Sequence, residues 1–177
     1  MFKKILSNKA YPVVFLAIIV TVSVVLLMAV NSLTSSVVES RRVEEITGIL
    51  EEIFPEMSQY ELEGEVYIIY QDEAKAGYAF KASGSGYGGD IDIVVGLDNN
   101  FGIIGISILS QTETPGVGTK ITESSFTDQF KGLSVSDIAL KSEGGKIDAI
   151  TGATISSRAV VDAVKEKMVE IIDTLEK

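Results

Sequence analysis

The sequence predicts a chain of mixed helices and strands, with the strands grouped in the middle. Three observations indicate this: an uncharged apolar run over 10–38, four short runs rich in Ile, Val and Tyr between 66 and 109, and an apolar helical repeat from Ile155 onward. We therefore expect one folded domain over 59–177, preceded by helical segments.

Three residue types that carry much of enzyme chemistry are absent. The 177 residues include no Cys, no His and no Trp. Without Cys there is no disulfide, thiolate nucleophile or Fe–S ligand, and without His there is no Ser–His–Asp triad, haem ligand or ordinary zinc site. Redox chemistry would need a cofactor that requires none of these ligands, and a flavin meets that condition.

The N-terminal region has the pattern of a membrane anchor. Residues 1–9 include Lys3, Lys4 and Lys9, residues 10–38 carry no charge, and the first acidic residue is Glu39. A bilayer core needs roughly 20 apolar residues, and basic residues before the span predict a cytoplasmic N-terminus and an extracytoplasmic domain. The alternative is a cleaved signal peptide, whose apolar region would be shorter, about 7–15 residues.

The part after this span is acidic. All 25 acidic residues and 12 of the 15 basic residues follow it, which disfavours nucleic-acid binding because that function needs a basic face. Residues 39–58 begin with an amphipathic juxtamembrane helix, in which Val43, Ile46, Leu50 and Ile53 recur at three and four residues and Pro55 ends the helix. It either extends the span as a stalk or packs on the domain.

The predicted strands cover 66–70, 77–82, 91–97 and 103–109, and Asp98-Asn99-Asn100 forms a hairpin turn between the last two. The glycine-rich segment 84–89 lacks the Lys-Ser/Thr of a P-loop, so we expect a flexible or ligand-facing loop. A short helix over 124–130 and a last strand over 146–150 complete the expected order.

The segment 148–157 combines a strand end, a turn at Gly152 and a helix start. Backbone N–H groups converge at such a helix N-terminus and favour an anion such as phosphate. We expect Thr154 in the turn and Ser156 or Ser157 as the helix cap, because a hydroxyl can accept from a free N–H of the first turn.

Two motifs and a loop together resemble the FMN-binding domain family. Asp148-x-x-Thr151-Gly152-Ala153-Thr154 is similar to its flavinylation motif, Asp-x-x-Ser/Thr-Gly-Ala-Ser/Thr. Glu113-Thr114-Pro115-Gly116-x-Gly118 resembles its second motif, in the expected order, and 86–91 resembles its glycine-tyrosine loop. With the single N-terminal span, the chain is most similar to the RnfG family, subunits of the Rnf ion-translocating electron-transport complex. The related NqrC family of sodium-translocating NADH:quinone reductases is the alternative.

The resemblance implies an α+β fold, with an antiparallel sheet flanked by helices. It implies FMN bound covalently to Thr154 through a phosphoester, attached by a flavin transferase that uses FAD as donor. It also implies electron relay between the integral-membrane and soluble subunits of the Rnf complex, which couples ferredoxin and NAD to Na⁺ or H⁺ transport, without a substrate reaction of its own.

The matching positions supply further expected cofactor contacts. Glu113 and Thr114 are expected to make polar contacts with the flavin, and Lys120 to stabilise its reduced charge. Asp148 is expected to hold the turn by accepting backbone N–H bonds, with metal orientation during attachment as the alternative. The remaining expected residues are Tyr87, Gly88, Gly116, Gly118, Thr151, Gly152, Ala153, Ser156 and Ser157.

Two other functions fit parts of the sequence. The amphipathic helix and acidic domain are compatible with a membrane-anchored assembly module that carries no cofactor. A free-standing extracytoplasmic reductase is the third hypothesis, although no second redox domain is visible in the sequence. The added mass of one bound FMN would distinguish the flavoprotein electron carrier from the assembly module.

Overall fold

The computed structural model describes residues 11–175, so the predicted cytoplasmic segment 1–9 lies outside the described residues. The chain divides into two compact units, residues 1–45 and 46–177. Helix α2 (Tyr11–Ile53) begins in the first unit and ends in the second.

The first unit is helical wherever it is described. Its large apolar side chains between Val13 and Met28 are exposed, and Thr21 donates from Oγ1 to the carbonyl oxygen of Ala17 at 2.8 Å. The sequence predicts a membrane-spanning helix over 10–38. Residues 11–38 are indeed helical, but no helix in the described part of the chain is both long enough and apolar enough to cross a membrane.

The second unit contains a five-stranded antiparallel sheet in which each strand pairs with the next, in the order β1-β2-β3-β4-β5. The strands are β1 (Gln59–Glu63), β2 (Val66–Gln71), β3 (Ala74–Ser85), β4 (Asp90–Asp98) and β5 (Ile103–Ser110). The four predicted strands are confirmed, and all are longer than expected. Residues 84 and 85 therefore belong to β3 rather than to the glycine-rich loop.

The predicted hairpin turn between β4 and β5 is also confirmed. Asp98 Oδ1 accepts from the backbone N–H groups of Asn100 at 2.7 Å and Gly102 at 2.9 Å. Phe101 takes a left-handed conformation with φ 62°, and its ring stacks on that of Tyr78 at 6.0 Å between centroids. The Asp98 side chain thus satisfies turn amides that have no strand partner.

Strand β4 is buried on both faces, because Ile93 to Leu97 are all buried, and its side chains belong to two apolar clusters, one on each face of the sheet. Val94 belongs to a cluster with Ile46, Leu50 and Ile53 of α2, whereas Val95 belongs to a second cluster that includes α4. Because side chains of a strand alternate between faces, the sheet is covered by helix on both faces. The end of α2 therefore packs on the domain. The helix ends at Ile53, one residue short of the end that Pro55 predicts.

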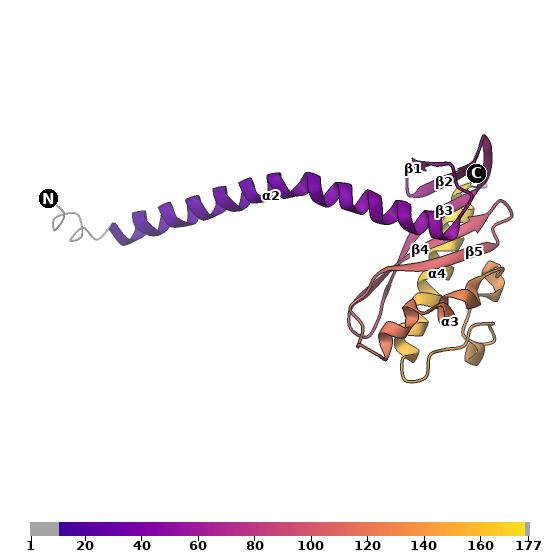
Figure 1. The fold of residues 1–177 in the computed structure, drawn as a ribbon. Helices are drawn as coiled ribbons and strands as arrows, with labels where there is room; N and C mark the ends of the chain where they lie inside the picture. The colour runs from indigo at the N-terminus through magenta and orange to yellow at the C-terminus, as the bar shows by residue number, and fades with distance from the viewer. Residues whose placement is uncertain (1–10, 176–177) are drawn as a thin grey trace. The chain divides into compact units, whose positions relative to one another are not determined.

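Helix α4 (Thr154–Leu175) crosses one face of the sheet (Figure 1). Five of its six predicted apolar positions, Val160, Val161, Val164, Met168 and Ile171, are buried. The α+β class with flanking helices is confirmed.

Short helical segments fill the chain between β5 and α4. These are η1 (Gly118–Thr122), α3 (Ser124–Thr127), η2 (Asp128–Phe130), η3 (Val135–Asp137) and η4 (Lys141–Glu143). The predicted short helix over 124–130 corresponds to α3 and η2. The predicted strand over 146–150 is wrong, because only Ile147 forms a single parallel bridge, to Leu140. Beyond that bridge, the backbone of Asp148 pairs with the side chain of Gln129 instead of a strand.

Candidate functional site

The turn before α4 is fixed by two kinds of hydrogen bond. The N–H of Ala153 donates to the carbonyl oxygen of Ile150 at 2.9 Å, and Gly152 has φ 84°, a left-handed conformation that favours glycine. Ser157 Oγ accepts from the N–H of Ile150 at 3.0 Å and donates to the carbonyl oxygen of Ala153 at 2.9 Å. The turn is therefore tied to the first turn of the helix that follows it.

Two details of the predicted helix start are wrong. Helix α4 begins at Thr154, so Thr154 is the first helical residue rather than part of the turn. Ser156 and Ser157 lie inside the first turn and are not caps. Both are buried, and their hydroxyl groups bond inward to Glu113 and to the turn, because at these positions they face the domain instead of the open helix end.

Thr154 is exposed at this helix N-terminus. The first four N–H groups of an α-helix have no intrahelical acceptor, and the helix dipole adds partial positive charge at the same end. Thr154 therefore lies at a helix end of the kind that favours an anion such as phosphate.

A cavity of about 360 Å³ opens beside Thr154. This volume lies within the roughly 300–1,000 Å³ of ordinary small-molecule sites. Three separate segments line it: the loop after β3, the segment after β5, and the start of α4. Its lining residues are Tyr87, Glu113, Thr114, Val117, Gly118, Gly152, Ala153, Thr154, Ile155 and Ser156.

The structure thus brings both sequence motifs and the glycine-tyrosine loop to one cavity. Eight of the predicted site residues line it, and six do not. The six are Gly88, Gly116, Lys120, Asp148, Thr151 and Ser157. Val117 and Ile155 line the cavity but were missed, because an apolar residue inside a motif resembles ordinary core in the sequence.

Glu113 is buried within the wall of this cavity, with 5% of its surface exposed. Its Oε1 accepts from the N–H of Gly88 at 2.9 Å, and its Oε2 accepts from the Ser156 hydroxyl at 2.6 Å. Gly88 therefore contributes to the site indirectly, through Glu113. The carbonyl oxygen of Thr114 accepts from the N–H groups of Val117 and Gly118 at 3.2 and 2.9 Å, which folds the motif into a compact turn.

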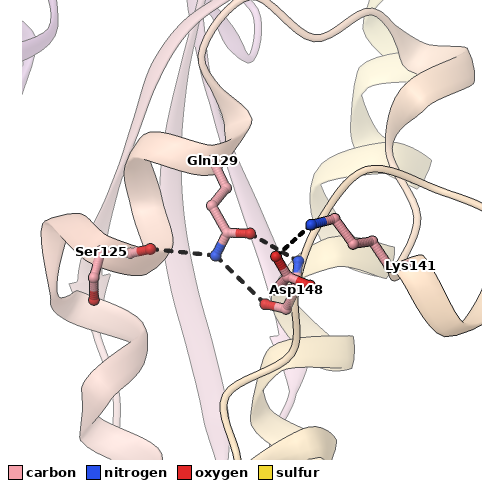
Figure 2. A network of polar contacts seen from close by, with 4 residues as sticks. All are labelled: Ser125, Gln129, Lys141 and Asp148. Atoms are coloured by element: carbon pink, nitrogen blue, oxygen red, sulfur yellow. Dashed lines mark hydrogen bonds and ion pairs between the residues drawn. The ribbon is translucent and has the colours of Figure 1, made fainter.

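Asp148 lies outside the cavity, in a network that holds the approach to the motif (Figure 2). Gln129 Oε1 accepts from the N–H of Asp148 at 2.7 Å, and Gln129 Nε2 donates to the carbonyl oxygens of Ser125 and Asp148 at 3.2 and 3.4 Å. The Asp148 carboxylate accepts from Lys141 Nζ at 2.5 Å. The expectation that this carboxylate accepts backbone N–H bonds is wrong, because the Lys141 ammonium is its partner.

A second, smaller hollow of about 220 Å³ shares Thr154 and Ile155 with the first and includes Arg158 and Asp162. Arg158 forms an ion pair with Glu143. Arg158 is not among the predicted site residues, although its position four residues after Thr154 places both on one face of the helix.

Comparison with known proteins places the chain in a family. Residues 86–168 match the family model described as FMN-binding domain. The chain is 31% identical over 166 residues to the G subunit of the ion-translocating oxidoreductase complex of Methanosarcina acetivorans, a match that covers 86% of this chain and 88% of that protein. The chain belongs to this family, the RnfG family.

Other matches agree with the RnfG assignment. The chain is 29% identical to the corresponding G subunit of Pasteurella multocida, over 97% of this chain and 98% of that protein. Its fold resembles the crystal structure of NqrC from Shewanella oneidensis with a TM-score of 0.51 and 24% identity, covering 58% of this chain and 54% of that chain. Membership of the RnfG family favours the Rnf interpretation over the NqrC alternative.

Proposed function

We propose that this chain is the FMN-carrying subunit of an Rnf-type ion-translocating oxidoreductase complex, with FMN bound covalently to Thr154 and relaying electrons between neighbouring subunits. The observation that carries the proposal is the position of Thr154. Its side chain is exposed at a helix N-terminus, on a cavity lined by both motifs of the FMN-binding domain family.

The residues present fit this cofactor. The Thr154 hydroxyl supplies the oxygen for a phosphoester, and Gly152 and Ala153 leave space beside it. The N-terminus of α4 stabilises the negative phosphoester by about 0.3–1 kcal/mol. Tyr87 is 73% exposed on the cavity wall and presents an aromatic ring to a planar ligand. When bound, the flavin supplies the redox chemistry that the side chains of this sequence lack.

Attachment requires a flavin transferase with FAD as donor. The Thr154 Oγ1 atom forms a bond to the phosphorus of the FMN half, and the bond from that phosphorus to the bridging oxygen of the diphosphate breaks. AMP leaves with the bridging oxygen, and the hydroxyl proton passes to the transferase or to solvent. No net oxidation or reduction occurs, so the reaction needs no further reactant.

We also propose that residues 10–38 anchor the chain in a membrane, with residues 1–9 in the cytoplasm and the flavin domain outside. The uncharged composition of 10–38 and the three lysines before it support this topology. Charged side chains mark most ion pathways in membranes, so ion transport is assigned to the partner subunits. Protease added to intact cells or spheroplasts should remove the flavin domain, whereas a domain protected until lysis would reverse the orientation.

Covalent attachment is tested on full-length protein produced together with an active flavin transferase. After denaturation, the wild-type band should fluoresce, and its intact mass should increase by one FMN less one water. Thr154→Ala should abolish both signals, and Thr174→Ala, a matched control at an exposed threonine near the other end of α4, should retain the mass increase. Fluorescence equal to wild type in Thr154→Ala would exclude Thr154 as the attachment site. A wild-type chain without added mass would favour the assembly module that carries no cofactor.

A further inference from the structure

We propose that Glu113 is a positioning residue for the flavin site, and that its fixed negative charge lowers the reduction potential of the bound flavin. The inference rests on the proposed function and extends it to how this chain sets the properties of its cofactor.

Glu113 joins three segments that are far apart in the sequence. Its two carboxylate oxygens bond separately to Gly88, next to Tyr87, and to Ser156, two residues after Thr154. One side chain therefore fixes the loop that carries the aromatic ring relative to the helix end that carries the attachment hydroxyl.

One glycine of the glycine-tyrosine loop, Gly86, and one of the second motif, Gly118, leave the space that this side chain occupies. A Cβ atom at Gly86 would lie 2.2 Å from Glu113 Oε1, and one at Gly118 would lie 2.7 Å from Glu113 Oε2. A Cβ atom and a non-bonded oxygen do not approach this closely, so a side chain at either position would displace the Glu113 carboxylate from its hydrogen bonds to Gly88 and Ser156. Gly86, Gly88 and Gly118 are thus packed around Glu113.

The charge of Glu113 has no positive partner among the described ion pairs. Both oxygens act as hydrogen-bond acceptors, which is the pattern of an ionised carboxylate. A flavin gains negative charge on reduction unless a proton accompanies each electron. A buried negative charge on the wall of the same cavity disfavours that added charge, because like charges repel strongly where water is excluded.

Glu113→Gln separates the charge from the hydrogen bonds. The glutamine Oε1 can still accept from Gly88, and its Nε2 can donate to the Ser156 hydroxyl, which can accept. Full-length Glu113→Gln is compared with wild type after intact mass has measured how much FMN each protein carries. Its midpoint potential, measured by spectroelectrochemical titration, should rise by at least about 30 mV. For a two-electron couple this corresponds to a tenfold change in the equilibrium constant for reduction.

One further variant tests the hydrogen bond without the charge, and another is a control for the loss of an exposed charge. Ser156→Ala removes one hydrogen bond and keeps the charge, so it should lower the melting temperature without raising the potential. Glu61→Gln removes an exposed charge on β1, away from the cavity-lining residues, and should change neither quantity.

The outcomes are distinguishable. Loaded Glu113→Gln with the potential of wild type would overturn the role of the charge, as would an equal rise in Glu61→Gln. If Glu113→Ala keeps the wild-type melting temperature and FMN loading, the positioning role is wrong. Wild-type protein without FMN would overturn the proposed function and the charge role together, whereas a loaded wild type confines any failure to Glu113.

Discussion

The two ends of helix α4 differ in what they bury. From Val160 onward the helix follows the usual rule, with Val160, Val164 and Met168 showing no exposed surface. In the first turn the rule is reversed: Ile155 is 57% exposed, whereas Ser156 and Ser157 are buried. Buried hydroxyls are unfavourable unless they are hydrogen-bonded, and these are. The comparison indicates that the first turn is organised by specific polar contacts and the rest of the helix by apolar burial.

The largest expected effect is the loss of stability when a buried side chain at the apolar end of α4 is truncated. Met168→Ala should lower the free energy of unfolding by about 2–5 kcal/mol, because it leaves a cavity in the core shared by α4 and the sheet. Ile155→Ala, at the exposed end, should change it by about 0.5 kcal/mol or less. Urea unfolding of the full-length protein, followed by tyrosine fluorescence, measures both.

Equal losses in these two variants would contradict the comparison. Such a result would mean that Ile155 is buried in the working protein, against another chain or a ligand, and that the first turn is not an open end.

The second prediction tests the polar end. Ser157→Ala leaves the N–H of Ile150 without its acceptor, and should destabilise the protein by about 1–3 kcal/mol. Hydrogen exchange at the Ile150 amide should become faster, because the turn before Thr154 loses its link to the helix. Ser142→Ala, an exposed serine in η4, is the matched control and should leave both measurements unchanged. Unaltered exchange at Ile150 in Ser157→Ala would show that the turn holds itself without the helix.

The burial of the apolar end of α4 could be predicted from the sequence, whereas the polar contacts of its first turn could not, for a physical reason. Burial of Val160, Val164 and Met168 follows directly from helical periodicity, since one face of the helix must cover the sheet. The motif resemblance predicted Thr154 as a site residue. The Glu113–Ser156 contact was not predictable, because it joins residues 43 positions apart through the fold, and local patterns carry no information on such pairs.

The errors in the predicted fold also arise from contacts between residues far apart in the sequence. Strand β1 was not predicted. Four of its five residues are exposed and only Tyr60 is half-buried, so its sequence lacks the alternation of apolar and polar residues that indicates a half-buried strand. The segment 146–150 has strand-like composition, but its backbone beyond Ile147 bonds to the side chain of Gln129 (Figure 2). Pairing partners at both places are decided by tertiary structure, not by local propensity.

The smallest expected effect concerns the outer face of the apolar end of α4. Lys167 Nζ donates to Glu65 Oε2 at 2.5 Å and to Glu170 Oε2 at 3.0 Å. The hydrogen bond to Glu65, and then that to Glu170, raises the pKa of Lys167 above its ordinary value of 10.5. Because Glu65 is 71% exposed, the pair should contribute less than about 1 kcal/mol.

The sign of the pH dependence follows from the direction of this shift. A raised pKa means that the folded protein binds the proton more tightly than the unfolded chain, so the contribution is fully present below pH 10.5 and is lost as pH rises through the higher folded pKa. Lys167→Met should therefore be less stable than wild type at pH 8, with a difference that narrows above pH 10.5. Lys165→Met, on the same helix but in none of the described ion pairs, should show no such narrowing. A stability difference for Lys167→Met that is constant from pH 8 to pH 11 would assign the contribution to packing of the lysine stem, and would make apolar burial the organising force on this face of the helix too.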